Sequence, residues 1–307
     1  MTLRIGITGG GSTVDRIIDQ AAEAENDGFT SLWYGGGGRS MDVLTLLPLV
    51  GRATSRIELG TAIVQTYPRH PILMAQQAAT VAQAIGDGRF TLGVGVSHRP
   101  VVEYSYGLSY DTNARHLREY LTVLGALLAE GTVRFAGEEY QAASDLGVPV
   151  DPPVPVLVAA LAARSLRSAG ALAAGTITWM ANADAIESLI APELRDAAAG
   201  AGRPDPRIVA GLPVAVTDDV DGARETAART FTVYGTLPNY QRVLAAGGIS
   251  SPAEAAIVGP EDKVAAALED LVAAGATDIW AAPFPVGDDR GESRRRTRAL
   301  LRELGGA

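Results

Sequence analysis

The 307-residue sequence contains no cysteine and only three histidines. The absence of cysteine excludes disulfide bonds, thiolate metal ligands, cysteine nucleophiles and iron–sulfur clusters. The histidines His70, His98 and His116 form neither an HxH nor an HxxxH pair, so we expect no histidine-based metal site. A Gly-x-Ser-x-Gly elbow is also missing, which argues against a serine hydrolase.

Positive charge is in deficit, because the formal net charge is −9 at neutral pH. Broad nucleic-acid binding needs a basic face, so this balance argues against it. No apolar run is long enough to cross a bilayer, and the first residues lack the basic start and apolar core of a signal peptide. We expect a cytoplasmic protein that acts on a small-molecule substrate and binds neither nucleic acid nor membrane.

Eight short apolar runs alternate with stretches whose apolar residues recur at helical spacing. The runs are Leu3–Thr8, Phe29–Tyr34, Ile57–Val64, Phe90–Val96, Pro155–Ala160, Gly175–Met180, Ile208–Val216 and Thr277–Ala282. Several are apolar throughout, as is typical of parallel strands buried on both faces. The pattern predicts a (β/α)₈ TIM barrel that spans residues 1–307 as a single domain. A doubly wound open sheet is the alternative, which the chain length and the number of strands disfavour.

The alternation breaks once, between the fourth and fifth predicted units. Residues 132–153 contain VRFAGEEYQ, which is typical of a small hairpin, followed by the proline-rich DPPVP. Prolines of this kind favour an extended entry into the next strand. We therefore predict a short insertion here rather than a second domain.

In such a barrel the chemistry lies where strands end and the following loops begin. The fourth run ends in Gly93-Val94-Gly95-Val96-Ser97-His98, where glycines let a flat ring approach the backbone. His98 is the candidate catalytic residue, because an imidazole can donate to developing negative charge or move a proton near neutral pH. The alternatives are that the glycines ease strand packing and that His98 caps a loop.

The sequence gives less reason to assign a function to the other two histidines and to the tryptophans. His70 begins a helix, where we expect a structural or cofactor-adjacent position, and His116 lies on an amphipathic helix, where we expect packing or surface. For each tryptophan, a position in the hydrophobic core is the first expectation. Trp179, at the end of the sixth run, is the best candidate for lining a ring pocket.

Three segments carry a family resemblance: LGTAIVQTYPRHP, RFTLGVGVSH and AALAARSLRSAGALAAGTITWM. In this order and spacing they resemble the F420-dependent branch of the luciferase-like monooxygenase superfamily. The resemblance is weakest at residues 132–153 and 218–257. It implies hydride transfer with the deazaflavin coenzyme F420, with FMN as the alternative cofactor. It also allows a homodimer, since relatives are often dimers.

The resemblance implies specific positions for the cofactor. A non-prolyl cis peptide bond between Ala62 and Ile63 would lie in a bulge against the deazaflavin ring. The amides that end the fifth strand would meet the phosphate at a helix N-terminus, which suits an anion. The implied cofactor-binding residues are Ala62, Ile63, Gln65, Gly95, Ser97, His98, Ala160, Leu161, Ala162, Ala163, Arg164, Gly175, Thr176 and Trp179.

Two departures from the family pattern bear on function. Ala162 and Ala163 stand where relatives usually have glycine and often proline, and alanine crowds the approach of a phosphate. Relatives that oxidise sugar phosphates have an Asp-His pair after the second strand and a glutamate at the position of His98, whereas this chain has Gly35–Gly38 and His98. Oxidation of an alcohol needs a base, so we predict reduction of a conjugated C=C or C=N bond. An FMN-dependent monooxygenase and a non-catalytic deazaflavin-binding protein are the alternatives.

Overall fold

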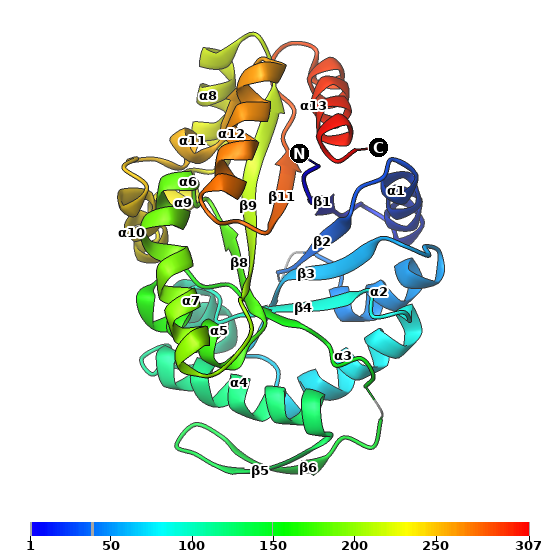
Figure 1. The fold of residues 1–307 in the computed structure, drawn as a ribbon, viewed down its shortest axis with the longest axis vertical. Helices are drawn as coiled ribbons and strands as arrows, with labels where there is room; N and C mark the ends of the chain where they lie inside the picture. The colour runs from blue at the N-terminus through cyan, green and yellow to red at the C-terminus, as the bar shows by residue number, and fades with distance from the viewer. Residues whose placement is uncertain (1, 38–39, 149, 307) are drawn as a thin grey trace.

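The computed structural model describes residues 2–37, 40–148 and 150–306, and its centre is a ring of parallel strands (Figure 1). The ring consists of β1 (Ile5–Gly9), β2 (Ser31–Gly36), β3 (Glu58–Gln65), β4 (Phe90–Gly95), β7 (Val156–Val158), β8 (Gly175–Trp179), β9 (Arg207–Val216) and β11 (Asp278–Pro283). All eight predicted strands are present. Pairing of β1 with β11 and of β8 with β9 closes the ring, so the predicted barrel is confirmed and the open sheet is wrong.

Helices surround the ring and cover its outer face (Figure 1). They are α1 (Val14–Asn26), α2 (Val43–Arg52), α3 (Pro71–Ile85), α4 (Asn113–Glu130), α5 (Ala163–Leu172), α6 (Ala183–Ala185), α7 (Ala191–Gly200), α8 (Val220–Thr230), α9 (Thr232–Gly235), α10 (Pro238–Ala246), α11 (Pro252–Ala255), α12 (Glu261–Ala273) and α13 (Arg290–Leu304). Two single π-helical turns also occur, η1 (Val101–Ser105) and η2 (Ile186–Ile190). Within the described residues no helix is both long and apolar enough to cross a membrane.

Local sequence signals explain several helix ends. Thr13 accepts a hydrogen bond from the backbone N–H of Arg16 and so caps α1, and Gly28 beyond its end has a φ of 80°. His70 caps α3 through Nδ1, which accepts from the N–H of Ile72 at 3.2 Å, and Pro71 is the first helical residue. The expectation of a structural role for His70 is therefore confirmed.

The predicted insertion is an antiparallel hairpin, β5 (Thr132–Ala136) and β6 (Gln141–Asp145), which lies beside α4 (Figure 1). Glu119 of α4 ties the hairpin turn to the barrel, because its carboxylate accepts from the N–H groups of Glu138, Glu139 and Tyr140 at 3.2, 2.8 and 3.1 Å. The hairpin therefore packs against the outside of the barrel.

The sequence did not indicate one strand, β10 (Ile257–Gly259). It pairs with Val214–Val216 at the far end of β9, where β8 no longer reaches. Only three residues take part, which is too few to produce a recognisable apolar period. It extends one side of the barrel beyond the eight-stranded ring.

Side chains fill the barrel interior, and ion pairs close its amino-terminal end. Trp33, Leu157, Ile177 and Val209 form a buried cluster inside the ring. Below them, Arg207 makes two hydrogen bonds to Glu58, at 2.6 and 2.9 Å, and two to Asp278, at 2.9 and 2.7 Å. All three charged residues are the first residues of their strands. This leaves the carboxyl ends of the strands as the side where a ligand can bind.

Candidate active site

Partly exposed residues gather at the carboxyl ends of three neighbouring strands. They are Ala62 and Ile63 near the end of β3, Val96 to His98 after β4, and Leu161 to Ala163 after β7. The peptide bond between Ala62 and Ile63 is cis, as predicted. The β3–β4 register shifts between Gly60 and Val64, so the predicted bulge is confirmed. This edge of the barrel is the candidate active site.

Gly95 and Gly93 have different roles, although both lie in β4. A Cβ atom on Gly95 would lie 3.0 Å from the Cβ of Ala159 and 3.1 Å from the Cδ1 of Ile63. A Cβ atom on Gly93 would lie 1.9 Å from the carbonyl oxygen of Thr61. Gly93 therefore allows β3 to pack against β4, and Gly95, which is buried, allows Ile63 and Ala159 to pack directly against the backbone of β4.

Gln65 and Ser97 join the ends of β3 and β4 by a hydrogen bond, in which Gln65 Nε2 donates to Ser97 Oγ at 3.1 Å. Tyr106 donates to Gln65 Oε1, and Tyr110 donates to the carbonyl oxygen of Ser97 at 3.0 Å. Ser97 has a φ of 63°, which few non-glycine residues adopt. The two tyrosines thus hold the loop that carries His98.

His98 lies at the predicted place and is only partly exposed. Its ring contacts Tyr240, with 5.9 Å between ring centroids. Burial lowers the pKa of His98, because desolvation disfavours the charged imidazolium. The side chain is therefore neutral at pH 7 and can both accept and donate a hydrogen bond.

The segment predicted to meet the phosphate leads into the N-terminus of α5. Ala160 is fully buried, so direct contact falls to Leu161, Ala162 and Ala163, which are partly exposed. The N-cap residue Ala162 has no side chain that can accept a hydrogen bond, whereas Ser165 Oγ accepts from the backbone N–H of Ala162 at 3.4 Å. The first N–H groups of α5 point outward along the helix axis, where they favour an anion.

Of the two arginines in α5, one is already engaged in an ion pair and the other is not. Arg167 is paired with Glu193 at 2.8 Å. Arg164 is exposed, and within the described part of the chain it forms no ion pair. Of the two, Arg164 is the residue that remains free to bind an anion.

Gly175 and Thr176 do not belong to this site, and their predicted contact with the phosphate is wrong. They are the first two residues of β8, and Gly175 is paired with Arg207 of the amino-terminal ion-pair network. Thr176 is fully buried and its hydroxyl donates to the carbonyl oxygen of Val158 at 2.7 Å. The sequence motif identified the right strand but the wrong end of it.

Trp179 lies at the carboxyl end of β8 and is partly exposed, as a ring-pocket residue requires. The sequence did not indicate the aromatic residues around it: Trp280 of β11 at 5.0 Å between ring centroids, Tyr234 of α9 at 6.1 Å and Phe231 at 6.2 Å. Tyr240 then lies 4.8 Å from Tyr234. The only available signal was that Phe231, Tyr234 and Tyr240 lie within ten residues of one another.

His116 takes the packing position that was expected of it. It is 5% exposed and stacks on Tyr67 with 3.9 Å between ring centroids. Thr66 Oγ1 lies 2.8 Å from its Nε2, and the hydroxyl of Tyr140 lies 3.1 Å from its Nδ1. Burial lowers the pKa of His116 to about 4. It supports the loop after β3 and has no surface to offer a substrate.

The glycine-rich loop after β2 is described only as far as Gly37, and Gly38 lies outside the described residues. Gly36 packs closely on β3, since a Cβ atom there would lie 2.8 Å from the carbonyl oxygen of Ile63. The loop therefore places backbone, and no titratable side chain from Gly35 to Gly37, against the cis peptide.

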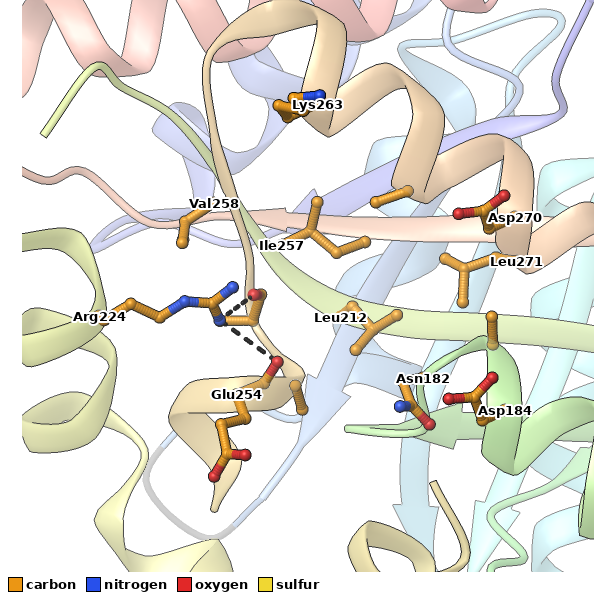
Figure 2. A pocket seen from close by; sticks show the side chains of 14 residues that line it. Asn182, Asp184, Leu212, Arg224, Glu254, Ile257, Val258, Lys263, Asp270 and Leu271 are labelled. Carbon is orange, nitrogen blue, oxygen red and sulfur yellow. Dashed lines mark hydrogen bonds between the residues drawn. The ribbon is translucent and has the colours of Figure 1, made fainter. Parts of the chain in front are cut away.

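A cavity of about 290 Å³ lies outside this site, between the outer face of β9 and β10 and the surrounding helices (Figure 2). Arg224 of α8 points toward it and donates from Nη1 to the carbonyl oxygens of Glu254 and Ala256 at 3.2 and 2.6 Å. The guanidinium thus caps α11. The cavity shares no residue with the candidate site, which rests on the strand ends instead.

A model of the luciferase-like monooxygenase family matches residues 2–278. The chain belongs to this family. Among curated relatives, an F420-dependent glucose-6-phosphate dehydrogenase from Nakamurella multipartita is 30% identical over 253 residues, which are 78% of this chain and 73% of the relative.

Solved structures of proteins with different cofactors share the fold. An F420-dependent secondary alcohol dehydrogenase in complex with an F420–acetone adduct has a TM-score of 0.80 and 18% identity, covering 99% of both chains. The oxygenating constituent of 3,6-diketocamphane monooxygenase from Pseudomonas putida, in complex with FMN, has a TM-score of 0.75 and 16% identity, covering 100% of this chain and 99% of that chain. At these identities the likeness establishes the barrel fold alone.

Proposed function

We propose that this luciferase-like protein is an F420-dependent oxidoreductase that transfers a hydride between the deazaflavin and a small organic substrate. The direction that we propose is reduction of a conjugated C=C or C=N bond. The supporting observation is that partly exposed residues at the carboxyl ends of three neighbouring strands, β3, β4 and β7, meet beside the N-terminus of α5. Relatives at 30% identity whose names state F420 dependence support the same cofactor.

The residues at the strand ends fit a flat ring with an anionic tail. Ile63 and Gly95 would bound the ring, while the amides of Leu161 to Ala163 and the guanidinium of Arg164 would hold the phosphate. The side chains of Ala162 and Ala163 reduce the space for the phosphate, and the N–H of Ala162 also donates to Ser165 Oγ at 3.4 Å. When bound, F420 supplies a carbon-centred hydride donor or acceptor, and the protein orients and shields it.

His98 fits the proposed reduction. A neutral imidazole at the carboxyl end of β4 can donate from a ring nitrogen to an oxygen or nitrogen that gains negative charge after hydride addition. The direction is proposed because sugar-phosphate-oxidising relatives have an Asp-His pair after the second strand, where Gly35 to Gly37 bear no titratable group. Gln65, Ser97 and Tyr110 position the His98 loop through their hydrogen bonds.

Parallel titrations of the purified protein with oxidised F420 and with FMN, followed by calorimetry, test the cofactor. We expect F420 to bind at least about tenfold more tightly than FMN. Tighter binding of FMN would favour the alternative function, an FMN-dependent monooxygenase. Binding of neither cofactor would contradict the proposed function. Binding of F420 without oxidation of reduced F420 by any conjugated substrate would favour the non-catalytic alternative.

His98→Ala is expected to lower kcat by about 10- to 100-fold, because loss of a proton donor typically costs this much or more. The Kd for F420 should change by less than about threefold, since the ring and phosphate contacts remain. His98→Gln is the matched variant, which keeps a hydrogen-bond donor but cannot titrate. The wild-type pH profile should show an ionisation below the usual histidine value that both variants lack. Unchanged kcat in His98→Ala would remove His98 from the mechanism.

A further inference from the structure

Five aromatic side chains form a continuous surface over the candidate site, which we name the aromatic wall: Trp179, Phe231, Tyr234, Tyr240 and Trp280. Trp179 is at its centre, with ring centroids 5.0 Å from Trp280, 6.1 Å from Tyr234 and 6.2 Å from Phe231. Tyr240 continues it from Tyr234 at 4.8 Å. The rings come from β8, β11 and the segment 231–240, so the tertiary structure alone assembles them.

The wall extends from one side of the barrel mouth to the other. At one end Tyr240 contacts His98 after β4. At the other end Trp280 packs against the buried interior cluster, and its indole N–H donates to Thr8 Oγ1 at 2.9 Å. Trp179, Phe231, Tyr234 and Trp280 each keep part of their surface exposed. The wall therefore offers aromatic surface that begins beside the candidate catalytic residue.

Positive charge available to a substrate is scarce around this wall. The arginines that follow β3 and β4 are engaged, Arg69 with Asp42 and Arg99 with Asp111 at 2.9 Å and Glu103 at 2.5 Å. The one lysine of the sequence, Lys263, lines the cavity outside the barrel (Figure 2). Arg164 forms no ion pair among the described residues, and the proposed function assigns it to the cofactor. Arg242, two residues beyond Tyr240, is exposed and donates to Asn239 Oδ1 at 3.2 Å.

From these observations we infer that the aromatic wall selects a planar, uncharged, conjugated carbonyl compound as the substrate, rather than a phosphorylated sugar. This inference rests on the proposed function. Aromatic faces bind flat conjugated molecules by stacking and by removing apolar surface from water. A phosphate or carboxylate placed against the same rings would lose hydration that the ring faces do not replace.

A matched pair of ligands tests the inference: benzylideneacetone, which is flat and neutral, and its ring-carboxylated derivative, with glucose 6-phosphate as a third ligand. Binding to the cofactor-free protein is measured by calorimetry, and KM and kcat are measured with reduced F420. We expect benzylideneacetone to bind at least about tenfold more tightly than either anion. Tighter binding of an anion, or no binding of benzylideneacetone, would overturn the inference.

The variant Tyr234→Leu tests whether benzylideneacetone binds at the aromatic wall. We expect it to weaken benzylideneacetone binding, and to raise its KM, by at least about fivefold, because the stacking contribution of an aromatic pair is of this size. The Kd for F420 should stay within about twofold. Tyr104→Leu is the control, since Tyr104 is 89% exposed on η1. Equal binding by Tyr234→Leu and the wild type would overturn the inference. Benzylideneacetone binding by a protein that binds no F420 would contradict the proposed function alone.

Discussion

Replacing Gly95 with valine is expected to weaken F420 binding by at least about 100-fold. Even a single Cβ atom at this position would lie 3.0 Å from Ala159 and 3.1 Å from Ile63, and valine adds two further methyl groups. Those methyls must either displace Ile63 or occupy the surface that the flat ring needs. Fluorescence or calorimetric titration with F420 measures the effect.

Gly95→Ala serves as the graded control for this variant. Its Cβ requires the neighbours to move by only a few tenths of an ångström, so we expect a loss of about tenfold or less. Circular dichroism and the thermal midpoint should show that both variants fold. Normal F420 binding by folded Gly95→Val would mean that the cofactor site lies elsewhere.

Replacing Arg207 with alanine is expected to reduce the free energy of unfolding by about 3–5 kcal/mol, because two carboxylates in the barrel lose their main partner. Arg207 makes four hydrogen bonds to Glu58 and Asp278, whose side chains are 15% and 3% exposed. Urea-induced unfolding of both proteins measures the difference. Arg16→Ala is the control, because Arg16 is 69% exposed and its pair with Asp19 spans 3.8 Å. A loss below about 1 kcal/mol would contradict the structural role of this network.

The effect of Arg207→Ala should also depend on pH. Burial by itself raises the pKa of Asp278, but hydrogen bonds from Arg207, Thr277 and Arg4 and the charge of Arg207 outweigh it, so the pKa is lowered. A lowered folded-state pKa means that the carboxylate stabilises the fold above its unfolded pKa and loses that contribution as the pH falls. The stability difference between wild type and Arg207→Ala should therefore become smaller in acid. An equal difference at neutral and acid pH would contradict this assignment.

The barrel and the strand end that carries His98 could be predicted from local sequence patterns. Buried parallel strands must be apolar on both faces, so runs such as Phe90–Val96 are visible without any partner. The same local logic located the hairpin insertion and the strand end that carries His98. The cis bond between Ala62 and Ile63 followed from family resemblance and is present.

The position of a residue along its strand, and the side chains that meet across the barrel mouth, could not be predicted from the sequence. Gly175 and Thr176 are in the expected strand, but at its amino end, because the strand begins at Gly175. Phe231, Tyr234 and Tyr240 come from the segment with the weakest resemblance, and they meet Trp179 and His98 through contacts between residues that are far apart in sequence. Hydrophobic periodicity and sequence motifs depend on residues that are close together in the sequence, so they do not indicate contacts between distant segments. The aromatic wall depends on how the segment 231–240 crosses the barrel, which is fixed by packing and by no local signal.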